Sequence, residues 1–202
     1  MSKSVLISIR PKWCEKILNG EKTIEVRKTK PKLTTPFKCY IYCSLPPKDE
    51  MFTHGSTCEY ARELIRDQDG NIKYTYGMSL ICDEQHRPYS KDNFLCRKVI
   101  GEFICDKMYL IAYTICPHDP PVFEEYGTLN RPDVRRQTCL NPLELDEYLS
   151  GNNGYGWHIS ELKIYDKPKE LSEFTRLRDT KFGATPEEIK RPPQSWYYVE
   201  EQ

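Results

Sequence analysis

The stretch Ile7–Lys28, which reads ISIRPKWCEKILNGEKTIEVRK, decides the fold of the first part of this chain. Residues 4–10, which lead into it, alternate between an apolar and a mixed face, as in a strand packed on the core from one side. Pro11 suits the first position of a helix, and apolar residues then recur at helical spacing up to Leu18. The Asn-Gly pair at 19–20 ends that helix, because both residues tolerate the left-handed conformation of a C-cap. The sequence therefore predicts a strand, a short helix over 11–19 and a tight turn.

A second strand is predicted after the turn, because polar and apolar residues alternate over 22–28. Gly20, Lys22, Glu25 and Arg27 in this region match the G-x-K-x-x-E-x-R signature of ASCH domains, which belong to the PUA-like superfamily. Further strand-like segments follow in the order of that family; they are YIYCS, VIGEF and GWHISELKI, at 40–44, 99–103 and 156–164. The chain thus resembles the ASCH-domain proteins of bacteria and their phages over about half its length.

Several short strands combined with a few short helices predict an α+β fold. The resemblance implies that the strands near 4–10, 22–28, 38–44, 98–113 and 157–165 form one small PUA-like mixed β-barrel with short flanking helices. The periodicity alone does not select this barrel. Asn141 is expected to cap a short helix over 142–149.

We expect a single ASCH/PUA-like domain over 1–202, with insertions at about 48–96 and 117–140. The first insertion has too few apolar residues for a core of its own. It is expected to contain a short helix over 58–66 and a hairpin around the Asp-Gly turn at 69–71.

Composition restricts the class of protein. The chain has 202 residues, no apolar run long enough to span a bilayer and no signal-peptide pattern, so we expect a cytoplasmic protein without a membrane partner. Its nine cysteines are an odd number and form no C-x-x-C pair or zinc-finger spacing. Free buried thiols are therefore expected, with no metal and no cofactor. The oligomeric state is not predicted.

The net charge is zero, but the basic residues gather near the beginning of the chain. Residues 1–38 contain ten lysines and arginines against three acidic residues, a net of +7. Such asymmetry indicates a basic surface that faces an anion. Lys28, Lys30 and Lys32 could equally well be ordinary solvent-exposed lysines that face no ligand.

Lys22 is the first candidate for chemistry, with Thr23, Glu25 and Arg27 close to it in sequence. In ASCH proteins this region lines a cleft, so the resemblance implies that Lys22, Glu25 and Arg27 face it. A surface ion pair that contributes little is the alternative, and Glu25 with Arg27 could hold the shape of the site instead. Lys22 points away from Glu25 and Arg27 in a regular strand, so all three meet only at a bulge or if Lys22 precedes the strand.

Aromatic residues near these elements could stack on a nucleobase. Tyr155, in the expected Gly/Asn loop 150–156, is the expected exposed platform, whereas core packing is the better interpretation of Trp157. His158 is the most suggestive of the four histidines by position, although a histidine bonded to the nearby backbone is as good an explanation. Arg10, together with Lys12, could contact phosphate.

The family includes small amidohydrolases that act on N4-acylated cytidine. This chain resembles them at Lys22, but it has Glu25 where they have a threonine, with Thr23 two positions earlier, so a threonine nucleophile is not carried over. A lysine–carboxylate pair could still act as acid and base if burial shifts its pKa.

Two functional hypotheses and a third alternative follow. The first is a module that binds RNA or a modified nucleoside in a cleft rimmed by Lys12, Lys22, Arg27 and the segment 155–158. The second is a hydrolase acting on a nucleoside or RNA, of the amidohydrolase or ribonuclease type, with Lys22 and Glu25 as the acid–base pair. The third is a protein–protein adaptor that uses residues 48–96.

Overall fold

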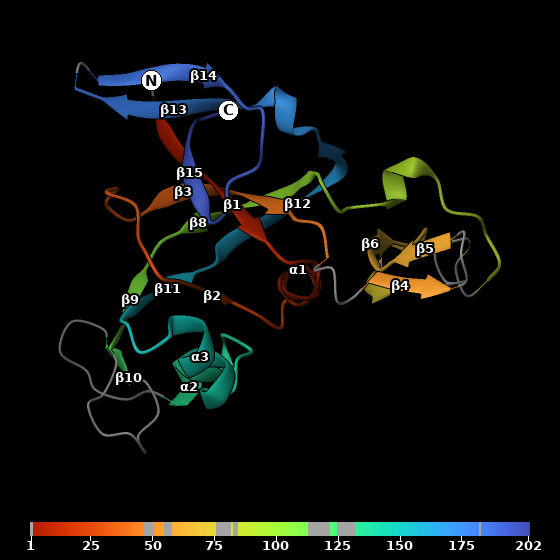
Figure 1. Ribbon diagram of the computed structural model, residues 1–202, viewed down its shortest axis with the longest axis horizontal. Coiled ribbons are helices and arrows are strands. Elements are labelled where there is room, and N and C mark those ends of the chain that lie inside the picture. The colour runs from red at the N-terminus through yellow and green to blue at the C-terminus, as the bar shows by residue number, and fades with distance from the viewer. Residues whose placement is uncertain are drawn as a thin grey trace. The chain divides into compact units, whose positions relative to one another are not determined.

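The computed structural model describes residues 2–46, 51–54, 58–75, 82, 85–112, 122–124, 132–181 and 183–202. It contains many short strands and few helices, as the α+β prediction requires (Figure 1). The helices are α1 (Pro11–Leu18), η3 (Lys91–Asn93), α2 (Pro132–Arg136), α3 (Pro142–Leu149) and η4 (Leu171–Glu173). The strands are β1 (Lys3–Ile9), β2 (Ile24–Arg27), β3 (Phe37–Cys43), β4 (Met51–His54), β5 (Cys58–Ala61), β6 (Glu63–Arg66), β7 (Ile72–Thr75), β8 (Val99–Cys105), β9 (Met108–Ala112), β10 (Val122–Glu124), β11 (Gly154–His158), β12 (Ser160–Lys169), β13 (Thr175–Thr180), β14 (Gly183–Glu188) and β15 (Trp196–Glu200).

The chain forms two compact units, each built from segments that are distant in sequence. The first unit contains residues 1–19, 39–102 and 163–202, and the second contains residues 20–38 and 103–162. The chain passes from one unit to the other between residues 19 and 20, after α1, and again within β3, β8 and β12.

The first unit holds most of a seven-stranded sheet, with the order β12-β8-β3-β1-β15-β13-β14. β1 is parallel to β3 and antiparallel to β15. Strands β1, β3, β8, β12 and β15 of this sheet contribute to one buried cluster, together with two residues outside the strands. The buried residues of this cluster are Leu6, Tyr40, Tyr42, Val99, Tyr165, Phe174, Ile189 and Val199. Removing such side chains from water is the main stabilising contribution, at about 1.5–3 kcal/mol for each large apolar residue.

Helix α1 belongs to the same unit and begins at Pro11, as predicted. It buries Cys14, Ile17 and Leu18 and ends at Asn19, after which Gly20 adopts a φ of 77°. The Asn-Gly pair thus ends the helix for the predicted reason, because this backbone conformation suits glycine.

The second unit is built on a four-stranded sheet with the order β10-β9-β11-β2. β11 is antiparallel to both of its neighbours, and Gly156 lies opposite Val26 on one side and Tyr109 on the other. An added Cβ at Gly156 would lie 3.0 Å from Ile24, so only glycine fits here without a shift. The apolar face of this sheet packs with the helical segments; the cluster comprises Ile24, Val26, Tyr109, Ile111, Val134, Leu145 and Leu149.

The capped helix predicted at 142–149 is confirmed as α3. The Asn141 side chain accepts a hydrogen bond from the Glu144 backbone N–H, and the Glu144 carboxylate accepts one from the Asn141 N–H. This reciprocal capping box satisfies two donors that the first turn otherwise leaves open. Leu145 and Leu149, one turn apart, are the buried residues of the helix.

The predicted strands exist, but they belong to two sheets instead of one. β1, β3, β8 and β12 lie in the seven-stranded sheet, whereas β2, β9 and β11 lie in the four-stranded sheet. Among the described strands, neither sheet closes into a ring. The expected strand at 157–165 is interrupted at Ile159, between β11 and β12.

Gly101 lies within β8, where a Cβ would come within 2.6 Å of the Lys163 carbonyl oxygen. The close approach of a neighbouring strand therefore explains this glycine.

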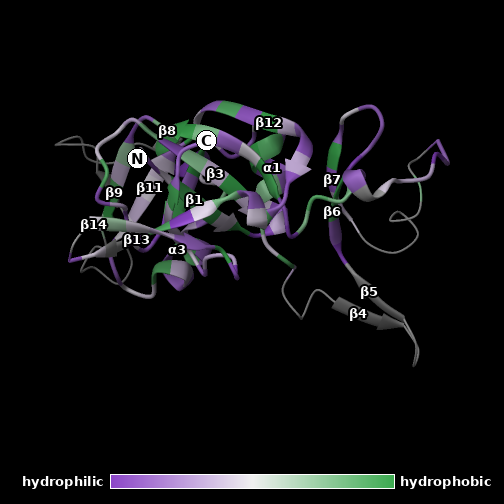
Figure 2. Cartoon of the chain, turned by 90° about the horizontal axis from the view of Figure 1, so that it is seen from above, coloured by the Kyte–Doolittle hydropathy of each residue, from purple (hydrophilic) through white to green (hydrophobic). Residues whose placement is uncertain are grey.

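The segment 48–96 contains one correct and one wrong prediction. The Asp-Gly turn joins β6 and β7, with the Asp67 carboxylate accepting hydrogen bonds from the backbone of Asp69 and Asn71. This turn is hydrophilic (purple in Figure 2). The helix predicted at 58–66 is wrong, because those residues form β5 and β6. Pairing with β4 and β7 supplies hydrogen bonds that override the weak local preference for a helix.

The hairpin β6–β7 is attached to α1 within the first unit. The backbone N–H of Tyr74 donates to the Glu15 carboxylate at 2.8 Å, and the Asn19 side chain donates to the Ile72 carbonyl at 3.3 Å. The buried residues Leu64 and Ile65 belong to β6. Half of the second predicted insertion, 117–140, lies outside the described residues, and the described half includes β10 and α2.

Candidate nucleic-acid interface

Lys22 lies before β2 rather than within it, because the strand begins at Ile24. The Gly20 turn places Lys22 outside the regular alternation, so its side chain reaches the same side as Glu25. Lys22 would point away from Glu25 and Arg27 if it were part of a regular strand, and its position before β2 removes this conflict.

The Lys22 ammonium is buried, with 2% of the residue exposed, and surrounded by acceptors. It donates hydrogen bonds to the carbonyl oxygens of Ile24 at 2.8 Å and Thr138 at 2.6 Å, and it lies 3.4 Å from the Glu25 carboxylate. An ammonium has three N–H donors, so these three acceptors can use all of them.

Glu25 connects Lys22 to Arg27 in one buried network. One carboxylate oxygen of Glu25 faces Lys22, and the other lies 2.9 Å from the Arg27 guanidinium. Glu25 and Arg27 are 5% and 7% exposed, respectively. Such a buried network stabilises only when every charge keeps its partner. The motif residues therefore meet as expected, but in the protein interior.

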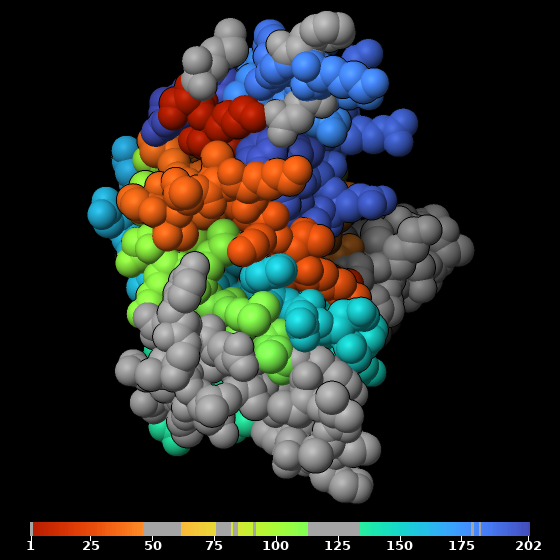
Figure 3. Space-filling model, turned by 90° about the vertical axis from the view of Figure 1, so that its left-hand side faces the viewer, coloured from red at the N-terminus to blue at the C-terminus, as the bar shows by residue number. Residues whose placement is uncertain are grey.

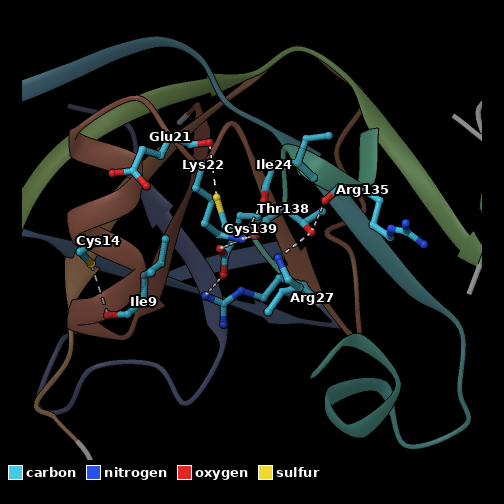
Figure 4. A network of polar contacts seen from close by, with 11 residues as sticks. Ile9, Cys14, Glu21, Lys22, Ile24, Arg27, Arg135, Thr138 and Cys139 are labelled. Carbon is cyan, nitrogen blue, oxygen red and sulfur yellow. Dashed lines mark hydrogen bonds and ion pairs between the residues drawn. The ribbon is translucent and has the colours of Figure 1, made fainter. Parts of the chain in front are cut away.

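The connection between α2 and α3 encloses the Lys22 ammonium (Figure 4). The carbonyl of Gln137 accepts hydrogen bonds from the backbone of Thr23 and Ile24, and the Cys139 thiol donates to the Glu21 carbonyl at 3.4 Å. The Thr23 hydroxyl also bonds the Gln137 side chain at 3.0 Å. Residues 21–24 and 137–139 are thus held together along their length.

Burial lowers the pKa of the Lys22 ammonium below its usual 10.5, although the charge of Glu25 and its hydrogen bond oppose this. Loss of water around a cation favours its neutral form, whereas a nearby carboxylate favours the charged form.

Tyr155 lies on β11, which begins at Gly154, and is half-buried. The expectation that it sits in a loop is therefore wrong, because pairing with β2 and β9 extends the strand through the glycines. The Lys30 ammonium lies 5.3 Å from the centre of the Tyr155 ring. A similar pair lies nearby in sequence: the Lys28 ammonium is 5.5 Å from the ring of Tyr148, which is 39% exposed.

Trp157 is fully buried and packs edge-on against Phe37, with the ring centres 5.8 Å apart. This confirms its interpretation as a core residue. His158 bonds a carboxylate instead of the backbone: its Nδ1 lies 2.6 Å from the Asp106 oxygen, and both side chains are partly exposed. Burial alone would raise the pKa of Asp106, but the hydrogen bond with His158 and the electrostatic attraction to it lower that pKa below its usual 3.8.

Arg10 and Lys12 belong to the first unit, whereas the other seven candidate residues belong to the second. The Arg10 carbonyl accepts the first hydrogen bonds of α1, and Lys12 lies 4.4 Å from the centre of the Trp13 ring. Both residues therefore lie at the start of α1.

Sequence reasoning missed four residues that the structure brings to the candidate residues: Thr138, Cys139, Asp106 and Tyr148. No motif marks them, and they approach only through folding.

Within the described residues, no group of three or more His, Cys, Asp or Glu side chains is arranged to hold a metal ion. The seven cysteines whose side chains are described are free thiols. None of the described helices has the length and apolar character needed to cross a membrane.

No protein-family model matches the sequence, and no curated protein matches it. Among solved structures, the chain is similar to an ASCH protein from Zymomonas mobilis, at 14% identity and a TM-score of 0.49, over 98% of this chain and 87% of that one. A single-residue variant of that protein gives a TM-score of 0.50 at 13% identity, over 98% of this chain and 88% of the other. At this identity the likeness concerns the fold alone. The likeness at a TM-score of 0.50 over 98% of this chain shows that the chain has the fold of an ASCH domain.

Proposed function

We propose that the second unit binds single-stranded RNA or a modified nucleobase on the surface formed by Lys28, Lys30, Tyr148 and Tyr155. The two lysine–tyrosine pairs carry this proposal, because each offers an aromatic ring beside a cation. The ASCH fold, which the sequence resemblance associates with RNA and nucleobases, supports the same function.

The chemistry of these four residues matches a single strand better than a duplex. An unpaired base can stack on a tyrosine ring, whereas a paired base is covered by its neighbours. The lysine beside each ring can contact the adjacent phosphate once the base has displaced it from the ring. Lys28 also bonds the Ser150 hydroxyl at 3.4 Å, which restrains it near Tyr148.

The buried network has a different role in this proposal. Lys22, Glu25 and Arg27 hold β2 against the 137–139 segment, and β2 leads directly into Lys28. We infer that the motif keeps the surface in shape and that it does not contact the RNA itself.

Fluorescence anisotropy with a labelled single strand and its duplex tests this function. Tyr155→Ala should weaken single-strand binding by roughly 1–3 kcal/mol and duplex binding less. Tyr198→Ala is the matched control, because Tyr198 is also half-buried beneath a lysine, Lys3, but belongs to the first unit. Equal losses in the two variants, or equal losses for both nucleic acids, would contradict the proposal.

The hydrolase alternative has one specific observation in its favour. The lowered pKa of Lys22 beside Glu25 is what an acid–base pair requires. Such a mechanism needs the ammonium to leave its carbonyl acceptors when the substrate binds. Mass spectrometry of RNA and N-acylated cytidine after incubation tests this alternative. A product that forms with the native chain and is lost in a folded Lys22→Met variant would favour the hydrolase over the binding module.

A further inference from the structure

The hairpin of β13 and β14 carries a concavity of about 490 Å³ in the first unit. Neither the motif nor the tyrosine surface uses it. It is lined by Arg178, Thr180, Lys181, Thr185, Pro186 and Glu187, and the apolar atoms of these residues provide more of the lining surface than their polar atoms do. The blue C-terminal segments, which include this hairpin, have side chains that stand out from the surface (Figure 3).

The register of the hairpin places Arg176, Arg178 and Glu187 on one face. Arg178 lies opposite Thr185, and Arg176 lies opposite Glu187, two residues further along each strand. Directly paired residues and those two positions away share a face of a sheet. Leu177 alternates with these residues and is buried, whereas its partner Pro186 on β14 is exposed, so the opposite face of the hairpin is packed at β13 only.

The single carboxylate in the lining already has a cationic partner. Glu187 lies 3.9 Å from the Arg176 guanidinium, which also lies over the Tyr197 ring at 4.9 Å. Within the described part of the chain, the side chains of Arg178 and Lys181 have no hydrogen bond or ion pair. Two positive charges in one concavity therefore lack a described counter-charge, which favours an anionic ligand.

We propose that this concavity binds the phosphate group of a nucleotide-sized molecule. Arg178 presents a planar fork of N–H donors that suits two phosphate oxygens, and Lys181 adds a second charge. The Thr185 hydroxyl, opposite Arg178, supplies a further donor. The volume lies within the range of about 300–1,000 Å³ found for small-molecule sites and exceeds what one phosphate fills. The phosphate is therefore attached to an organic group.

Calorimetric titration of the full chain with AMP and with inorganic phosphate, at low salt, tests the site. Arg178→Gln and Lys181→Gln should each weaken AMP binding by about threefold to tenfold, as for a solvent-exposed charged contact. Glu187→Gln should tighten it, because the only carboxylate in the lining is removed. Lys190→Gln is the matched control, since Lys190 is also exposed and in the same unit but does not line the concavity.

The outcomes distinguish a site for a nucleotide-sized molecule from a site for phosphate alone and from general attraction to surface charge. Tighter binding of AMP than of phosphate, with losses confined to the lining variants, is the expected result. Equal affinity for both ligands would overturn the nucleotide-sized part of the proposal. Equal weakening by Lys190→Gln would assign the attraction to general surface charge and overturn the site. Thermal unfolding of each variant verifies that the fold is retained. Failure of RNA binding leaves this test unaffected, because that surface belongs to the other unit.

Discussion

Two sets of lysines at opposite ends of β2 have opposite environments. Lys22, just before the strand, is buried among two carbonyl oxygens and a carboxylate. Lys28 and Lys30, just after it, are exposed and lie over tyrosine rings. A few residues thus separate a lysine that holds the structure together from two that can reach a ligand. The hydrogen-bond acceptors around each lysine ammonium decide which of these two roles the lysine has. Its distance in sequence from the motif does not.

The largest expected effect lies in the buried network. Glu25→Ala removes the carboxylate shared by Lys22 and Arg27 and leaves two cations buried beside each other. We expect a loss of about 3–5 kcal/mol in the free energy of unfolding. Urea denaturation measures it, and Lys30→Ala, expected within about 0.5 kcal/mol of the native chain, is the exposed control. A small loss for Glu25→Ala would remove the distinction between the two sets of lysines.

Lys22→Met should destabilise the chain less than Glu25→Ala, because Glu25 keeps Arg27 as a partner. The pH dependence sharpens this test. The folded pKa of Lys22 is lowered, so between that pKa and 10.5 the unfolded chain binds a proton that the folded chain has lost. The stability of the native chain relative to Lys22→Met should therefore rise as the pH increases toward 10.5. Denaturation of both proteins over this range measures the difference, and a constant difference would contradict the lowered pKa.

The exposed lysines should act through charge. Lys28→Ala and Lys30→Ala should each reduce the salt dependence of RNA affinity by about one counterion, with little effect on stability. Binding measured at about 50 and about 200 mM salt gives this slope. Lys163→Ala is a suitable control, because Lys163 is 70% exposed and lies in the first unit. An unchanged slope in both variants would exclude these lysines from the RNA surface.

The pair His158–Asp106 is partly exposed, so its environment lies between that of the buried network and that of the exposed lysines. Replacing one of its members should have the smallest effect of the substitutions considered. The folded pKa of Asp106 is lowered, so its contribution is present above about 3.8 and is lost as the pH falls through the folded pKa. Because Asp106 is 45% exposed, solvent screening limits the contribution to a fraction of a kcal/mol, about 0.2–1. Asp106→Asn should therefore flatten the acid side of the stability profile slightly, as measured by thermal unfolding at several pH values.

Local pattern was sufficient for elements that carry their own start and stop signals. Pro11 and the Asn-Gly pair bound α1, and Asn141 with Glu144 bounds α3, because these residues satisfy backbone groups within their own helix. The helix expected over 58–66 failed for the complementary reason. Its residues had no capping signal, and strand partners elsewhere in the chain determined their structure. The hairpin β13–β14 was missed because its exposed residues have no apolar alternation.

The sequence by itself determined which charged residues form the motif, where α1 and α3 begin and end, and that the core is made of short strands. Only the tertiary structure decided the role of each motif residue. The acceptors of Lys22 include the Thr138 carbonyl, a backbone group more than a hundred positions away that no residue pattern reveals. Burial is likewise a property of packing, so the same side chain is a structural cation at 22 and a candidate ligand contact at 28 and 30. Local spacing controls hydrogen bonds within an element, whereas desolvation and charge pairing depend on what the folded chain brings close.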